Sequence, residues 1–162
     1  MKQRLYIALV CVLSIVVLAG VYWAWVMPHR VFQLYDREQQ AVILEVPAKA
    51  GDTLVLELEH SAEHIPWFEY YTILEDNSFN LDAFAVAGYG AGIPAAQEST
   101  VRDGMVWTEN INTNFLELKW LTSNVYQKGL ELNGVEIFDF RTLPNASLIQ
   151  GVVITKRGYL GS

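Results

Sequence analysis

The residues most capable of chemistry lie in one short stretch, "HSAEHIPWFEYYTI", residues 60–73. Two histidines and two glutamates fall within ten positions there: His60, Glu63, His64 and Glu69. Histidine titrates near neutral pH and can bind a ligand through either ring nitrogen. A carboxylate withdrawn from water needs a partner, or it takes up a proton instead. These residue types could hold a solute, move a proton or bind a metal.

His60 and Glu69 form the core of the binding hypothesis. Residues 53–60 alternate strictly, and His60 continues the apolar face of this expected strand. If Leu58 lies opposite Glu69 in a hairpin, His60 lies opposite Trp67 and shares a face with Glu69. A shift of one residue would place the two on opposite faces. The sequence leaves this register open, and the competing interpretation is a strand-end histidine bonded to nearby carbonyls.

Metal binding and nucleophilic catalysis find less support in the same stretch. Histidines four residues apart converge on a helix, whereas His60 ends an expected strand and His64 lies in the loop after it. Their spacing with Glu63 or Glu69 matches no zinc pattern. Ser61 lacks the Gly-x-Ser-x-Gly elbow that exposes a nucleophile. We therefore expect no catalytic residue, no metal and no cofactor, and a chain that is not an enzyme.

A glycine-rich stretch, "GYGAGIP" (Gly88–Pro94), follows about fifteen residues later. No Lys-Ser or Lys-Thr pair comes after it, so it is not a phosphate-binding loop. Its glycines permit positive φ and close backbone approach, and backbone amides there could face a carboxylate. The predicted binding residues are His60, Ser61, Pro66, Glu69, Gly90, Gly92 and Pro94.

The sequence predicts short β-strands on both sides of these candidate residues. The expected strands are 41–46, 53–60, 66–74 and 79–87, followed by "MVWTEN", "FLELKWL", "VEIFDF" and "SLIQGVVITK". Turn signals separate them, including "RDG", Asn133-Gly134 and "LPN". No stretch after residue 40 sustains a helical period. We expect an all-β domain over residues 41–162, an antiparallel β-sandwich or small barrel, joined by a mixed linker at residues 28–40.

The amino-terminal segment has a different character. After a basic leader at residues 1–4, no charged residue occurs from Leu5 to Met27. At about 1.5 Å per residue this helix would extend about 35 Å, enough to cross a hydrocarbon core of about 30 Å. A cleaved signal peptide is the alternative, with "VLAG" as its cleavage site, but the apolar run continues through residues 21–26. We expect a single transmembrane signal anchor in the cytoplasmic membrane, with the β domain on the periplasmic side.

The charge of the chain argues against some classes of partner, and its single cysteine excludes an intrachain disulfide. All 18 acidic residues follow the apolar segment, whereas two of the 11 basic residues, Lys2 and Arg4, precede it. The β domain is therefore strongly acidic, which argues against nucleic acid or anionic lipid as its partner. Cys11, within the apolar segment, is the only cysteine, so no intrachain disulfide can form.

Three motifs together resemble a known family. "HS" at 60–61, "PWFE" at 66–69 and "GAGIP" at 90–94 occur in order. They resemble the His-Ser-x-x-x-x-Pro-x-x-Glu and Gly-Ala-Gly-x-Pro signature of the bacterial domain-of-unknown-function family 1850. The likeness covers roughly residues 40–155. The matching positions are His60, Ser61, Pro66, Glu69, Gly90, Ala91, Gly92 and Pro94.

The resemblance implies a role for this chain, but no enzymatic activity is assigned to the family. Members look like companions of TAXI-type TRAP transporters, which carry organic acids. We therefore expect a non-enzymatic, membrane-anchored accessory subunit whose partner is a transporter permease or a solute-binding protein. The alternative is a small-molecule module that binds a carboxylate in a pocket near His60, Glu69 and the Gly88–Pro94 loop.

Overall fold

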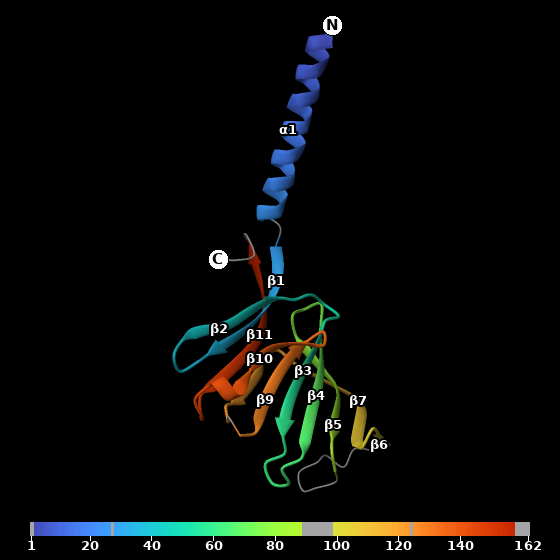
Figure 1. Ribbon diagram of the computed structural model, residues 1–162, viewed down its shortest axis with the longest axis vertical. Helices are drawn as coiled ribbons and strands as arrows, with labels where there is room; N and C mark the ends of the chain where they lie inside the picture. Colours follow the sequence, from blue (N-terminus) through green and yellow to red (C-terminus); the bar gives the residue numbers. More distant parts are fainter. Residues whose placement is uncertain (1, 27, 89–98, 124, 158–162) are drawn as a thin grey trace. The chain divides into compact units, whose positions relative to one another are not determined.

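The computed structural model contains one long helix and a β-rich domain (Figure 1). It describes residues 2–26, 28–88, 99–123 and 125–157. The elements within those residues are α1 (Lys2–Val26), β1 (Pro28–Asp36), β2 (Ala41–Pro47), β3 (Thr53–Glu59), β4 (Pro66–Ile73), β5 (Phe79–Val86), β6 (Ser99–Arg102), β7 (Met105–Phe115), β8 (Leu118–Leu121), β9 (Gln127–Leu132), β10 (Val135–Asp139), the 3-10 helix η1 (Phe140–Thr142) and β11 (Leu148–Arg157).

The chain divides into two units, Met1–Arg30 with Thr155–Ser162, and Val31–Ile154. The first unit contains α1, whose apolar side chains face every direction around the helix. Ile15, Val16, Val17 and Leu18 are consecutive, and each is 62–68% exposed. Taken over the residues whose side chains are described, no helix combines the length and apolarity needed to cross a membrane.

The second unit is built from two sheets. A four-stranded sheet has the order β2-β1-β11-β8, and a seven-stranded sheet has the order β10-β9-β3-β4-β5-β7-β6. The described pairings are antiparallel. The prediction of an antiparallel all-β domain preceded by one helix is confirmed, and the sheets form a sandwich-like arrangement.

The core lies where the two sheets contribute buried side chains to one cluster. Phe32 from β1 and Phe79 from β5 are fully buried, and their rings meet edge to face with centroids 6.1 Å apart. Gly151 on β11 makes this packing possible, because a Cβ atom there would lie 3.2 Å from the Phe32 ring and 3.1 Å from Trp120. Leu54 and Leu56 of β3 are also fully buried, which confirms the inward face predicted from the alternation of this strand.

The expected linker at residues 28–40 is wrong, because most of it forms strand β1. Phe32, Leu34 and Asp36 are buried along this strand. Alternate residues of β1 therefore face inward, although the segment also contains charged residues. Asp36 then accepts hydrogen bonds from the backbone N–H groups of Glu38 and Gln39, which makes the turn into β2. Charged residues of both signs are compatible with a strand when they lie in its turn or on its solvent-facing side.

Two further strands, β6 and β9, were not predicted either. β6 has four residues, all exposed, and β9 begins with the polar pair "QK" and contains Gly129. The turns that join these strands to their partners were predicted. Asp103-Gly104 and Asn133-Gly134 all adopt positive φ, between 52° and 76°, as a two-residue hairpin turn with the strand twist requires.

Candidate functional site

The β3–β4 hairpin places His60 and Glu69 on one side of the seven-stranded sheet. Leu56 pairs with Glu69, and Leu58 pairs with Trp67. The pairing of Leu58 with Glu69 considered from the sequence is wrong by two residues. Side chains alternate with a period of two, so this shift leaves every residue on the expected face.

The loop that joins the two strands is closed by its own backbone. The His60 N–H donates to the Ile65 carbonyl at 2.8 Å, and the His64 N–H donates to the His60 carbonyl at 2.8 Å. His64 adopts a positive φ of 55° within this turn. Glu63 is exposed, and the His64 side chain is 63% exposed. The bonded loop fixes the backbone of His60 directly after the end of β3.

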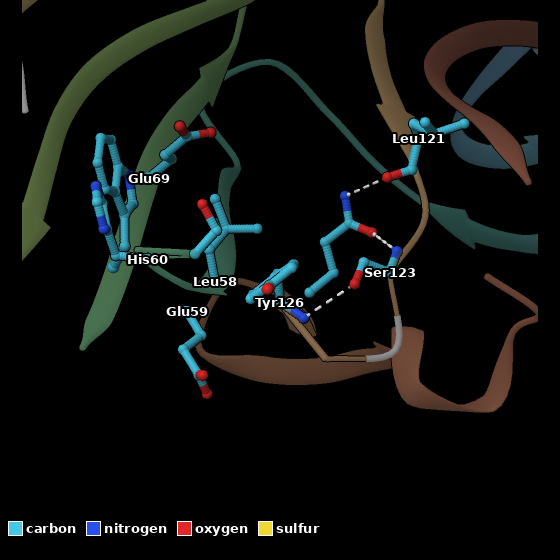
Figure 2. A pocket seen from close by; sticks show the side chains of 10 residues that line it. Leu58, Glu59, His60, Glu69, Leu121, Ser123 and Tyr126 are labelled. Atoms are coloured by element: carbon cyan, nitrogen blue, oxygen red, sulfur yellow. Dashed lines mark hydrogen bonds between the residues drawn. The ribbon is translucent and has the colours of Figure 1, made fainter. Parts of the chain in front are cut away.

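The hairpin forms one wall of a pocket of about 310 Å³. The segment between β8 and β9 lies across from it, and Figure 2 shows Glu69 and His60 on one side with Leu121 and Ser123 on the other. The lining residues are Leu58, Glu59, His60, Ser61, Trp67, Glu69, Leu121, Ser123, Tyr126 and Gln127. The pocket is open, and its volume is at the lower end for sites that hold small molecules.

Three stacked rings support the hairpin wall. His60 stacks on Trp67 with centroids 5.7 Å apart, and Trp67 stacks on Phe84 of β5 with centroids 5.4 Å apart. Nδ1 of His60 and Nε1 of Trp67 are both buried without a hydrogen-bond partner among the described residues. The interpretation of His60 as a histidine bonded to nearby carbonyls therefore does not hold for Nδ1. Unpaired buried polar atoms are uncommon and need an explanation.

Glu69 is the carboxyl group on this wall, and it is partly buried. Burial raises its pKa, an effect that the hydrogen bond from Tyr71 and the nearby Trp67 indole partly offset. The Tyr71 hydroxyl donates to Oε2 of Glu69 at 2.7 Å, whereas the indole N–H does not meet hydrogen-bond geometry. Burial also raises the pKa of Tyr71, with the Glu69 charge adding to the effect. Tyr71 is therefore a lasting donor to a carboxyl that protonates more readily than an exposed one.

Glu59 also lines the pocket, and its pKa shifts in the opposite direction to that of Glu69. Nδ1 of His64 lies 2.8 Å from Oε1 of Glu59, and Nζ of Lys128 lies 3.0 Å from Oε2. The hydrogen bonds from His64 and Lys128 lower the pKa of Glu59. The charge of Glu59 is therefore balanced by neighbours.

The opposite wall is held by a buried amide. Oε1 of Gln127 accepts the Ser123 N–H at 2.9 Å, and Nε2 of Gln127 donates to the Leu121 carbonyl at 3.3 Å. The Glu59 N–H donates to the Tyr126 carbonyl at 2.6 Å, which ties this wall to β3. Sequence reasoning missed Ser123, Tyr126 and Gln127, because they lie some sixty residues from the motif and no local pattern marks them.

The predicted binding residues are only partly brought together. His60, Ser61 and Glu69 line the pocket, and Ser61 is exposed. Pro66 begins β4, is exposed and does not line the pocket. The predicted residues Gly90, Gly92 and Pro94 lie outside the described residues. No group of three His, Cys, Asp or Glu side chains within the described ranges could hold a metal ion.

Comparison with known proteins gives one match. A family model described as "Domain of unknown function (DUF1850)" matches residues 54–138, from β3 to β10. No curated protein and no solved structure matches the chain. The matched segment covers more than half of the 162 residues and includes every residue that lines the pocket. The chain belongs to the DUF1850 family.

Proposed function

We propose that this protein is a non-enzymatic binding module that recognises a small solute in the pocket between the β3–β4 hairpin and the wall formed by Leu121, Ser123, Tyr126 and Gln127. One observation carries the proposal. The pocket gathers a partly buried carboxyl, Glu69, and two buried ring nitrogens, on His60 and Trp67. Among the described residues the carboxyl has no cationic partner and neither ring nitrogen meets hydrogen-bond geometry with a partner. Such incompletely paired polar groups beside apolar and aromatic side chains are typical of ligand sites.

The geometry favours binding over catalysis. Glu69 bonds to Tyr71, so the carboxyl does not orient His60 as a base through a described hydrogen bond. Nδ1 of His60 has no described partner, so it forms no couple with Ser61 through that atom. A nucleophile, a base and an orienting group in mutual contact are what hydrolytic sites require.

The proposal includes a membrane anchor. Its support is the uncharged run from Leu5 to Met27 and the apolar side chains exposed all around α1. A helix that is hydrophobic on every side is stable when lipid or protein surrounds it. The basic leader at residues 1–4 supports an orientation with the β domain on the periplasmic side of the cytoplasmic membrane.

A transporter role is the second candidate. The family resemblance supports an accessory subunit of a TAXI-type TRAP transporter, with the permease or its solute-binding protein as partner. Leu121 is 64% exposed at the pocket and offers such a partner an apolar contact. An anchor would raise the effective concentration of the domain near a membrane partner.

Two measurements test these proposals. Thermal unfolding of the full chain in a non-ionic detergent, with organic acids, amines and neutral solutes, should reveal at least one solute that raises the midpoint, because a ligand of the folded state stabilises it. No rise with any solute would contradict the binding module. Co-purification with the co-expressed permease tests the accessory role, and complete separation in several mild detergents would contradict it.

A further inference from the structure

The charges around the pocket favour one sign of ligand. Glu59 and Glu69 line it, and the described lining contains no Lys or Arg. Glu59 already has Lys128 and His64 as partners. Glu69 accepts a hydrogen bond from the neutral Tyr71 hydroxyl, and the Trp67 indole near it is neutral as well. When Glu69 is ionised, its charge is therefore the one that the described wall leaves uncompensated.

Part of the remaining lining is apolar or aromatic. Leu58 and Tyr126 contribute carbon surface between Glu69 and Ser123, and Leu121 lies on the same side as Ser123 (Figure 2). The faces of the Trp67 ring are taken by His60 and Phe84, so Tyr126 is the aromatic lining residue outside this stack. A carboxylate beside an aromatic ring and aliphatic carbon is the environment that attracts an organic cation.

An organic anion fits the same wall less well. A ligand carboxylate would meet two lining glutamates and no lining cation, so it would require Glu69 to be protonated. The domain itself is acidic, with all 18 acidic residues after the apolar segment, and its long-range field also repels anions.

We infer that the solute of this pocket carries an ammonium group, which pairs with the Glu69 carboxylate while its carbon body lies against Leu58 and Tyr126. This inference rests on the proposed binding function and names the chemical class of its ligand. Glu69 is the recognition residue, and Tyr71 holds its carboxyl in place.

The test uses four probes of similar size on the full chain in a non-ionic detergent. n-Butylammonium and tetramethylammonium represent the cations, butyrate the anion and 1-butanol the neutral body. Binding is followed through the Trp67 indole N–H signal in NMR, assigned by its loss in Trp67→Phe. The two ammonium probes should shift this signal in a saturable way, and butyrate should not.

Two matched variants identify the recognition residue. Glu69→Gln keeps the acceptor for Tyr71 and removes the charge, so it should weaken n-butylammonium binding about tenfold or more. Glu63→Gln makes the same change of charge on an exposed loop residue outside the lining and should leave binding unchanged. Equal affinities of Glu69→Gln and the unaltered chain would overturn the inference.

The probes also separate the two proposals. Saturable binding of butyrate or 1-butanol alone would overturn the ammonium inference and leave the pocket as a binding site. If none of the four probes and no solute of the wider panel binds, both the inference and the proposed function fail.

Discussion

The imidazole of His60 lies nearly parallel to the indole of Trp67, with ring centroids 5.7 Å apart and planes inclined by 15°. Trp67 in turn stacks on Phe84 of the neighbouring strand. Ring contacts with β4 and, through Trp67, with β5 therefore hold the side chain of His60, which lies just beyond the end of β3. These contacts give the hairpin wall of the pocket a defined shape. Stacked aromatic pairs stabilise a folded protein by more than the burial of their apolar surface alone provides.

Loss of the central ring should therefore destabilise the domain. Trp67→Ala removes the contact to both His60 and Phe84, and we expect the free energy of unfolding to fall by about 3 kcal/mol. Trp67→Phe keeps a ring in the stack and should cost less than about half as much. Urea unfolding measures both, and equal losses would show that the stack contributes no stability of its own.

Glu69 should make stability depend on pH in an identifiable window. Burial raises its folded pKa above the ordinary value of 4.5, so between 4.5 and the raised value the folded state holds more protons than the unfolded state. The contribution of Glu69 to stability is thus full below pH 4.5 and is lost as the pH rises through the folded pKa. Glu69→Gln should remove this decline and raise the thermal midpoint at pH 7 by a few degrees.

Midpoints measured from pH 4 to pH 8 check this prediction. The unaltered chain and Glu69→Gln should differ least at pH 4 and most above the raised pKa of Glu69. Glu59 borders the same pocket and is present in both proteins, so its contribution cancels in the difference. A difference that stays constant with pH would contradict the assignment to Glu69.

Gln127 should hold the second wall. Gln127→Ala leaves the Ser123 N–H and the Leu121 carbonyl without the bonds described above, in a place where the side chain is only 8% exposed. We expect a loss of about 2 kcal/mol in the free energy of unfolding, together with faster amide hydrogen exchange at Ser123. The control Gln150→Ala removes an amide that bonds to Glu117 away from the pocket; comparable exchange at Ser123 in both variants would contradict the role of Gln127.

The packing of the two sheets should tolerate no side chain at Gly151. Gly151→Ala places a Cβ atom against Trp120 and Phe32, both of which pack in the core, and we expect a loss of about 1–3 kcal/mol. Gly20→Ala in α1 is the matched control, because nothing lies within 4 Å of its added carbon. Unfolding curves of the two variants that coincide with the unaltered chain would show that the contact relaxes freely.

Much of the fold follows from local patterns. The alternation of residues 53–60 identifies β3 and its inward face, and Asn133-Gly134 identifies a hairpin turn, because both signals depend on neighbours in sequence. The sequence alone predicts a linker in place of β1, because the apolar positions of this strand are interleaved with Arg30, Gln33 and Asp36. Its burial depends on the partner strands β2 and β11, which no local pattern specifies.

The site was predictable on one wall only. His60, Ser61 and Glu69 occur in one motif, and period-two alternation keeps them on the predicted face even though the register is shifted by two residues. The second wall comes from Leu121, Ser123, Tyr126 and Gln127, which the pairing of β9 with β3 brings to the hairpin. Contacts between segments so far apart in sequence depend on the sheet order, and one sequence does not reveal that order.

The most direct test of the solute-binding pocket is an NMR titration of the full chain with a panel of amines, organic acids and neutral solutes. We expect at least one solute to shift the Trp67 indole and His60 imidazole signals together, with saturation, and Gln127→Ala to weaken the effect. Solutes that shift only signals remote from these two rings, or no signal at all, would contradict it.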